Sequence, residues 1–388
     1  MSRLFDAFDR HRYWNAEESL ILDQVRRAAK NVIAPAAAAV DRDAAFPNDS
    51  MAALNKLGAN AIFVPEAYGG AGQSYPLYLE VVRIIAGACA ATGITYATNF
   101  HAAAPIIDFG DEEQKRRFLP RIAEGGLGAI AITEPHAGSD ALAMRTAFTE
   151  KGDEVVIDGD KCFITSGDVA GTLLLFGKWA GIEQENAALT VAVIERPNPG
   201  IEVMRIEDKM GHRGSSTAAL AFSNCRIPRS NVLGRPGDGL KILRAALNRS
   251  RPSTAAHALG IGRAALEDME SYMNARVQSG RRVIDNQANQ FLLADLAAEL
   301  AMAEKWLHYV SALAEAGEDV ALEASIAKLR ASDIAMRLAI DAVQMHGGYG
   351  YCRDMRVERL MRDAKVTQIW EGTNQVHRQL IGRSFISK

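Results

Sequence analysis

The stretch Arg362-Asp363-Ala364-Lys365-Val366-Thr367-Gln368-Ile369-Trp370-Glu371-Gly372-Thr373-Asn374 sets a single carboxylate between a large aromatic side chain and a glycine. The tryptophan ring would shield Glu371 from water on one side, and the glycine lets the backbone approach a ligand closely. A poorly solvated carboxylate accepts a proton readily, which is what a general base must do. An exposed loop glutamate could have the same neighbours, so the rest of the chain has to decide between these readings.

Length, charge and cysteine usage exclude several classes of protein. The 388 residues suffice for two or three domains, and a net charge of -3 gives no basic surface for nucleic acid or for an anionic membrane. The cysteines lack metal-type spacing, so we expect no metal site and four reduced, buried thiols: Cys89, Cys162, Cys225 and Cys352. Residues Met1–Arg10 do not resemble a signal peptide and no apolar run could span a bilayer, which predicts a cytoplasmic protein.

Helical periodicity dominates the first third of the chain. Apolar residues recur every three or four positions over 17–33, which predicts a helix ending at Pro35. A second helix begins at Met51, capped by Asp49 or Ser50 and stopped at Gly58. The nearly uncharged segment Tyr75–Ala104 predicts a buried helix. The remaining signals are a glycine-rich loop at 64–72 and a helix from Asp111 to Pro120.

The periodicity changes after residue 123 and changes back at Gly237. Short β-rich runs between turn residues, at 154–159, 172–178, 189–195 and 218–223, predict an all-β domain over 123–236. Three long helical segments then predict a bundle over 237–388, which contains Glu371. We therefore expect a helical domain at 1–122, a central β domain and a helical bundle. The three long segments are 242–278, 286–316 and 322–345.

The stretch around Glu371 closely resembles the block that carries the catalytic base in the acyl-CoA dehydrogenase family, and the resemblance covers nearly the whole chain. It implies an α+β fold with an N-terminal helical domain, a central β-barrel or sandwich and a C-terminal four-helix bundle. It further implies an FAD enzyme in which Glu371 removes the α-proton of an acyl-CoA while the β-hydrogen leaves as hydride to the flavin, giving the trans-2-enoyl-CoA.

A first polar turn, Thr133-Glu134-Pro135-His136-Ala137-Gly138-Ser139-Asp140, offers hydroxyls and amide donors without a basic side chain. Taken alone it could be an ordinary turn. It resembles the family signature Thr-Glu-Pro-x-Ala-Gly-Ser-Asp. The resemblance places Thr133 on the pyrimidine edge of the flavin and Ser139 beside the pantetheine or the flavin, with His136 at a variable position.

A second segment, Gly159-Asp160-Lys161-Cys162-Phe163-Ile164-Thr165-Ser166-Gly167, puts an aromatic ring and a hydroxyl on one side of a strand. A half-buried strand face would look the same. The segment resembles the family block that flanks the flavin, which implies that Phe163 packs on the isoalloxazine and that Thr165 reaches N5. Ser166 departs mildly from the asparagine that many members carry.

Three further blocks fall in or near the bundle. Arg276 could bind a diphosphate, and the glycines after Gln344 could let a nucleotide approach the backbone. Taken alone, Arg276 is more simply explained as a cation at a helix end, and the glycines as the end of a helix. The resemblance implies that both blocks bind the ADP part of FAD across a subunit interface, although Ser279 replaces the usual phenylalanine. The basic loop 209–217 resembles a run near coenzyme A without assigning roles. The resemblance gives these cofactor residues: Arg276, Gln287, Gln344, Gly347, Gly348 and Thr373.

On the substrate side the resemblance implies Arg251, Trp370 and Gly372, with Trp370 standing where tyrosine is common and narrowing the thioester pocket. No acid lies beside Arg251 on its helix, where some relatives carry their base, so Glu371 is the candidate. The resemblance also implies a homotetramer reoxidised by electron-transfer flavoprotein. An acyl group on a carrier protein, or a flavin- or acyl-binding scaffold without turnover, remains an alternative, and the length and branching of the acyl chain stay open.

Overall fold

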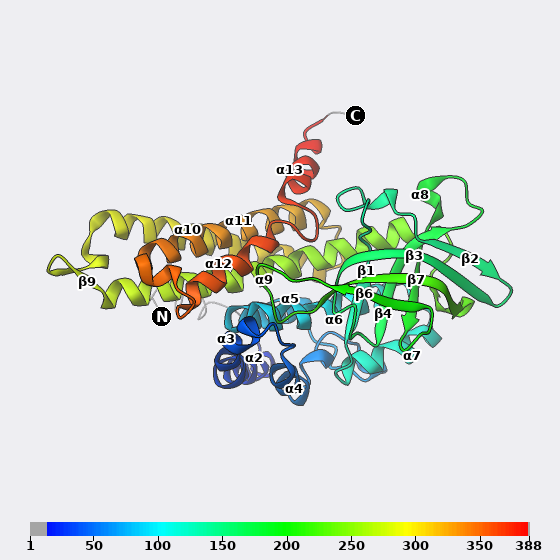
Figure 1. The fold of residues 1–388 in the computed structure, drawn as a ribbon, viewed down its shortest axis with the longest axis horizontal. Coiled ribbons are helices and arrows are strands. Elements are labelled where there is room, and N and C mark those ends of the chain that lie inside the picture. Colours follow the sequence, from blue (N-terminus) through cyan, green and yellow to red (C-terminus); the bar gives the residue numbers. More distant parts are fainter. Residues whose placement is uncertain (1–13, 387–388) are drawn as a thin grey trace.

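The computed structural model of the protein describes residues 14–386, so the stretch Met1–Arg10 lies outside the described residues. Three parts are visible in Figure 1: the β domain at the right, the long bundle helices at the left, and the first helices along the lower side. A large hydrophobic core joins the N-terminal helices to the bundle, and a second core lies within the β domain. The expected order of helices, sheet and helices is confirmed.

The N-terminal helices differ from the prediction mainly at prolines. Pro35 does not end a helix, because it occupies an early position of a new helix that follows a π-helical turn at Ala29–Ile33. Pro120 lies inside a helix that ends at Ala123. Asp49 and Ser50 lie inside their helix and do not cap it. The helices are α2 (Ala16–Ala28), α3 (Ala34–Arg42), α4 (Asn48–Lys56), α5 (Tyr75–Ala88), α6 (Ala90–Phe109) and α7 (Glu112–Ala123).

The β domain is one sheet of eight strands in the order β6-β7-β3-β2-β4-β5-β8, with β1 paired to β4. Side chains alternate across β4, so Leu173 and Leu175 enter the core of the β domain whereas Leu174 and Phe176 enter the large core. The sheet is thus fixed against the helices. Its strands are β1 (Gly128–Ala131), β2 (Ala147–Lys151), β3 (Glu154–Thr165), β4 (Thr172–Trp179), β5 (Leu189–Glu195), β6 (Ile201–Ile206), β7 (Thr217–Pro228) and β8 (Val232–Leu233), with the short helix α8 (Glu185–Ala188) before β5.

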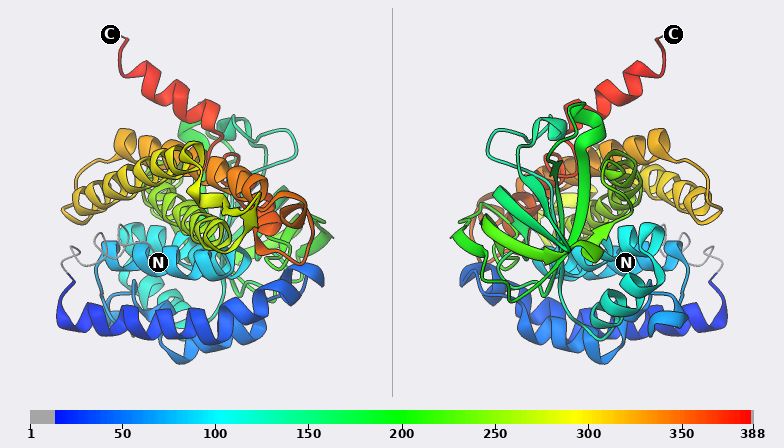
Figure 2. Two further views of the ribbon diagram at one scale, coloured as in Figure 1. Left: turned by 90° about the vertical axis from the view of Figure 1, so that its left-hand side faces the viewer. Right: turned by 90° about the vertical axis from the view of Figure 1, so that its right-hand side faces the viewer.

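The bundle is built around α9 (Gly239–Ala275), which packs against α5, α10 and α11. The hairpin β9–β10 (Val277–Gln278 and Arg281–Arg282) ends the bundle on the far side from the sheet. After α10 (Gln287–Glu315) and α11 (Ala321–His346), α12 (Arg356–Thr367) turns back along the bundle. The last helix, α13 (Asn374–Arg383), projects away from the body in both views of Figure 2.

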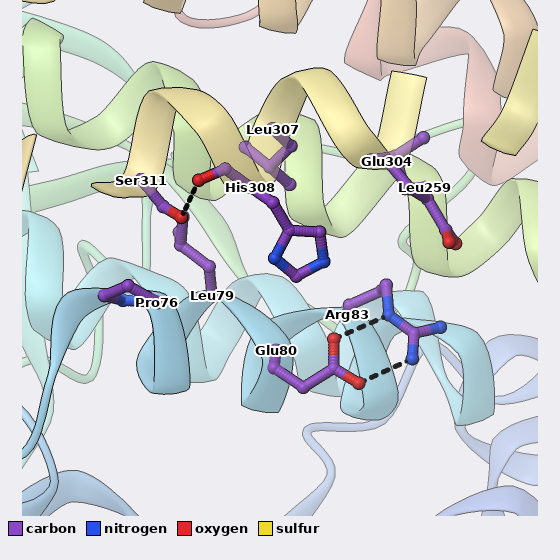
Figure 3. Close-up of a pocket in the computed structure, with 9 residues that line it drawn as sticks. All are labelled: Pro76, Leu79, Glu80, Arg83, Leu259, Glu304, Leu307, His308 and Ser311. Carbon is purple, nitrogen blue, oxygen red and sulfur yellow. Dashed lines mark hydrogen bonds and ion pairs between the residues drawn. The ribbon is translucent and has the colours of Figure 1, made fainter. Parts of the chain in front are cut away.

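One small cavity lies where α5 meets α9 and α10 (Figure 3). Its volume of about 10 Å³ is enough for roughly one water molecule, so it cannot hold an acyl chain. The Arg83 guanidinium donates to both carboxylate oxygens of Glu80 on one wall, at 2.6 and 2.9 Å. This cavity is part of the packing between the helices.

Two composition-based expectations can be compared with the described residues. No helix among residues 14–386 is long and apolar enough to cross a membrane. Cys89, Cys162 and Cys225 are buried free thiols as expected, whereas Cys352 is exposed. The prediction for Cys352 was wrong because it follows the 3₁₀ turn Gly347–Tyr351, whose side chains face outward.

Candidate active site

Glu371 lies in the short connection between α12 and α13. Its backbone is left-handed, with φ +53°, and Gly372 follows with φ +92°. A non-glycine residue in this region is strained, which indicates that the surroundings hold the carboxylate where it is. The side chain is half-buried, and the Ser250 hydroxyl of α9 donates to its Oε2 at 2.5 Å. The predicted base therefore faces a helix of the bundle.

A buried lysine anchors the same connection from α11. Lys328 Nζ donates to the Gly372 carbonyl at 2.7 Å and to Asn374 Oδ1 at 2.9 Å. Asn374 in turn donates to Ser332 and to Asp333. Burial lowers the pKa of Lys328 to about 7, opposed by the negative charges of Glu371 and Asp333. Lys328 thus holds the backbone immediately after the base.

Arg251 and Trp370 adjoin Glu371, as predicted. Arg251 is buried, and burial lowers its pKa while the charge of Glu371 opposes that change. Trp370 rests edge-on against the rings of His212 and His257, with ring centroids 5.0 and 5.6 Å apart. Thr373 caps α13 by accepting a hydrogen bond from the Val376 amide. The structure therefore gathers Glu371 with four predicted neighbours: Arg251, Trp370, Gly372 and Thr373.

The two polar motifs of the β domain are joined by a buried ion pair. Lys161 Nζ lies 2.8 Å from Glu134 Oε1, and both side chains are almost fully buried. Burial alone would raise the pKa of Glu134, but the charge and hydrogen bond of Lys161 lower it to about 2. The Cys162 amide also donates to the Thr133 carbonyl at 2.9 Å. The turn that begins at Thr133 is thereby fixed to β3.

Phe163 and Thr165 flank the buried Ile164 near the end of β3, where Phe163 is exposed and Thr165 is half-buried. Phe163 is 63% exposed, with φ +58°, at an irregularity in the pairing of β3 with β7. Ser139 is also exposed. An aromatic ring presented to solvent beside hydroxyl groups suits a planar, polar-edged group.

A second cluster lies at the other end of α9. A hollow of about 580 Å³ is lined by Arg276, Gln344, Gly347 and Gly348. No atom of a described residue lies within 4 Å of the position that a Cβ would take on either glycine, so their backbone is open. The Arg276 guanidinium lies 5.7 Å from the centre of the Tyr349 ring. A cation beside open glycine backbone suits a diphosphate and its nucleotide. Four predicted cofactor residues therefore meet in one hollow.

Two further residues of this region lie outside the hollow's lining. Gln287 is exposed at the start of α10, so the structure does not bring it to the other four. Ser279 and Gly280, with φ +51° and +77°, form the two-residue turn of the β9–β10 hairpin. Such a turn requires this backbone conformation at both positions.

The two clusters are far apart in one chain. Ser250, which contacts Glu371, is in the first half of α9, whereas Arg276 follows the last residue of that helix. The 25 helical steps from Ser250 to Ala275 cover roughly 37 Å of helix axis. One subunit therefore cannot present both clusters to a single compact site.

Sequence reasoning missed most of the partners that hold the site. Ser250 lies 121 residues from Glu371 in the sequence, and Lys328 lies 44 residues from Gly372. No spacing pattern links residues so far apart. Glu134 and Lys161 were inside the quoted motifs, but their contact depends on strand packing. Among the buried histidines, His101 had a signal in the sequence, because it interrupts an alanine-rich helix whose one charged residue is Asp108.

The residues present fit FAD. The hollow near Arg276 supplies a cation and open backbone for the diphosphate and adenosine, while exposed Phe163 and Thr165 supply a ring and a hydroxyl for the isoalloxazine.

Comparison with known proteins places the chain in a family. Three family models match: the acyl-CoA dehydrogenase N-terminal domain over residues 15–126, the middle domain over 129–225 and the C-terminal domain over 237–386. An acyl-CoA dehydrogenase of Bacillus subtilis is 41% identical, with 95% of this chain and 97% of that protein covered.

Two solved structures share the fold, each with a TM-score of 0.94. One, described as an electron transferring flavoprotein of Acidaminococcus fermentans, contains a chain 38% identical, with 97% of this chain and 99% of that chain covered. The other, butyryl-CoA dehydrogenase from Megasphaera elsdenii, is 34% identical, with 97% and 100% covered. The protein therefore belongs to the acyl-CoA dehydrogenase family, the FAD-dependent oxidoreductases that act on the CH–CH bond of acyl-CoA.

Proposed function

We propose that Glu371 is the base of an FAD-dependent α,β-dehydrogenation of acyl-CoA. The observation that carries this proposal is the strained, hydrogen-bonded position of Glu371 between α12 and α13. Bound FAD would supply the hydride acceptor. Glu371 Oε2 would take the α-proton of the thioester while Ser250 and Lys328 keep the carboxylate and its backbone in place.

An anaerobic titration tests this function. The FAD-loaded protein should lose its flavin absorbance on addition of an acyl-CoA, and the trans-2-enoyl-CoA should appear in equal amount. A panel of short, branched, aromatic and long acyl-CoAs would define the chain, and the same acyl groups on a carrier protein would test the alternative thioester. No loss of absorbance with any thioester would contradict catalysis and favour a binding scaffold.

Replacing Lys328 with Met should lower kcat about tenfold with little change in FAD content, because the Gly372 carbonyl and Asn374 lose their buried donor. Lys328 has a pKa of about 7 and is charged mainly below that pH. The hydrogen bonds of Lys328 are strongest when it is charged, so the loss of kcat in the variant should be larger at pH 6 than at pH 8.5. The matched control is Lys365→Met, an exposed lysine on α12. Equal deficits at both pH values would argue against a role for the charge.

We infer that each FAD is held by two subunits, with Glu371, Phe163 and Thr165 from one and the hollow around Arg276 from the other. The roughly 37 Å between the two clusters along α9 supports this inference. Exposed apolar side chains support assembly, because such residues rarely gather on the surface of a monomer. They include Met204, Ile206 and Met210 beside the β domain, Tyr349 and Tyr351 beside the hollow, and Phe385 after α13. A homotetramer, as a dimer of dimers, is the proposed assembly.

Replacing Arg276 with Ala should weaken FAD binding about 10- to 100-fold, because a charge-assisted hydrogen bond contributes about 1.5–3 kcal/mol. Co-expression of Arg276→Ala and Glu371→Gln chains then tests the shared site. If the site spans two subunits, a mixed pair contains one site with both groups intact and regains activity. If each site lies within one chain, no mixed pair has an intact site and activity stays low.

We further propose electron-transfer flavoprotein as the electron acceptor, supported by the similar chain in the electron transferring flavoprotein structure of Acidaminococcus fermentans. Reoxidation of the reduced enzyme by that flavoprotein, compared with reoxidation by oxygen, would test it.

A further inference from the structure

Two buried histidines contact Trp370, and a third lies near one of them. His101 comes from α6, His257 from α9 and His212 from the loop between β6 and β7, and none is more than 4% exposed. His212 Nε2 lies 2.8 Å from His257 Nε2, and the Trp370 ring rests on both. We call these four residues the histidine cluster.

The hydrogen bond between His212 and His257 fixes what their other nitrogens can do. Burial lowers the pKa of His257 to about 3 and holds the pKa of His212 well below its usual value, so both rings are neutral at physiological pH. Only one ring can carry the proton between the two Nε2 atoms. The donor ring then has a bare Nδ1, and the acceptor ring carries its proton on Nδ1.

The surroundings of His212 indicate which ring is the donor. His212 Nδ1 lies 3.7 Å from Asp363 Oδ1, an atom that also accepts from the His212 backbone amide at 2.5 Å. The 3.7 Å separation is too long for a hydrogen bond, but the ionised form of Asp363, whose pKa burial raises to about 7, electrostatically favours a proton on His212 Nδ1. His257 then donates from Nε2 and keeps an acceptor lone pair on Nδ1.

Besides His212 Nδ1, which faces Asp363, and nitrogens of Arg251 and His377 nearer Glu371, four polar atoms of this region have no hydrogen-bond partner among the described residues: His101 Nε2, Thr254 Oγ1, His257 Nδ1 and Trp370 Nε1. A buried polar atom without a partner costs about 1–3 kcal/mol. Four such atoms in one place indicate that their partner arrives with a ligand. The set contains donors and acceptors, since an indole nitrogen only donates and a hydroxyl does both.

These atoms lie along the path from Glu371 into the protein. Ser250, Thr254 and His257 are spaced by four and three residues, so they share one face of α9. Ser250 contacts Glu371, which places Thr254 and His257 roughly 6 and 10 Å farther along the same face. His101 is close enough for the charge of Glu371 to oppose the lowering of its pKa by burial. An acyl chain that presents its α-carbon to Glu371 meets these atoms with its distal part.

We propose that this enzyme selects acyl groups that carry an uncharged hydrogen-bonding function, such as a hydroxyl, which Thr254 and the histidine cluster receive. The inference rests on the proposed function of Glu371 and adds the class of acyl chain. A charged end is disfavoured, because a buried carboxylate needs a paired cation and the neutral histidines provide none. A plain alkyl end leaves the four atoms unpaired, and a site built for hydrogen bonds discriminates strongly against such an analogue.

Matched substrates test the proposal on the FAD-loaded enzyme. One pair is 6-hydroxyhexanoyl-CoA and heptanoyl-CoA, and the other is 3-(4-hydroxyphenyl)propanoyl-CoA and 3-(4-methylphenyl)propanoyl-CoA. Within each pair a methyl group replaces a hydroxyl of similar size. At least one hydroxyl compound should exceed its methyl partner in kcat/KM by about tenfold or more. Methyl partners that react as fast or faster in both pairs would overturn the proposal.

Two variants of nearly unchanged shape locate the effect. Thr254→Val removes only the hydroxyl, and Trp370→Phe removes the indole donor while keeping an aromatic ring. Each should reduce the ratio of kcat/KM between the hydroxyl and methyl compounds severalfold, whereas the control Thr149→Val on β2 should leave that ratio unchanged. A preference unchanged in both variants would refute the assignment to these residues. Flavin reduction by any of these acyl-CoAs reports the proposed function separately, and only its absence with all of them would count against the Glu371 chemistry itself.

Discussion

Replacing Glu371 with Gln is expected to slow flavin reduction by acyl-CoA about 10²- to 10⁴-fold, the range typical of a lost general base. Glutamine has nearly the same shape, and its carbonyl oxygen can still accept the hydrogen bond from Ser250. The connection between α12 and α13 and its anchor Lys328 should therefore stay in place. Stopped-flow measurement of the flavin absorbance under anaerobic conditions gives the rate directly.

Two comparisons isolate the chemistry of the base. Glu318→Gln changes an exposed glutamate outside the site and should leave the rate unchanged. Ser250→Ala keeps the carboxylate but removes its donor, so its effect should be smaller than that of Glu371→Gln. FAD content should match the unaltered enzyme in all three variants. If Glu371→Gln reduces the flavin as fast as the unaltered enzyme, another group must remove the proton.

The helices and the sheet could be predicted because periodicity is a local property. The runs at 154–159, 172–178 and 189–195 became strands, and the three long segments after Gly237 became α9, α10 and α11. The errors arose where local rules compete. Proline was read as a helix end at Pro35 and Pro120, yet the π-helical turn before α3 and the last turn of α7 accommodate it.

The candidate site shows a sharper limit. Glu371, Arg251 and Trp370 could be named because their motifs lie in continuous sequence. What holds them could not be named, since Ser250 and His257 on α9, Lys328 on α11 and His212 in the loop between β6 and β7 lie far from Glu371 in the sequence. Trp370 was expected to narrow a thioester pocket, and the structure adds that its ring packs on two histidines. Tertiary packing decides such contacts, and a single sequence does not encode them as spacing.

Replacing Lys161 with Met is expected to destabilise the protein by about 3–5 kcal/mol, because it removes the buried cation beside Glu134 and leaves only the more exposed His136, whose Nε2 lies 3.5 Å from Glu134 Oε2. Methionine has nearly the length of the lysine stem, so the loss of packing should be small. Glu134 also accepts from the Thr146 hydroxyl and from the amides of Arg145 and Thr146. Disturbing it would loosen the turn after Thr133, so FAD binding should weaken as well. Denaturant unfolding and FAD titration measure the two effects.

The pH dependence of the stability difference distinguishes the loss of the ion pair from a loss of packing. In the native protein the pKa of Glu134 is about 2, below its usual value of 4.5, so the pair contributes fully above pH 4.5 and is lost as pH falls toward 2. Without Lys161 the pKa of Glu134 rises, and protonation relieves the unpaired charge at a higher pH. The stability difference between native and variant should therefore shrink as pH is lowered from 7 to 4. A packing defect would give the same difference at every pH. The double variant Lys161→Met with Glu134→Gln should recover part of the loss, because the buried charge is then gone, and a double variant no more stable than the single one would contradict the electrostatic explanation.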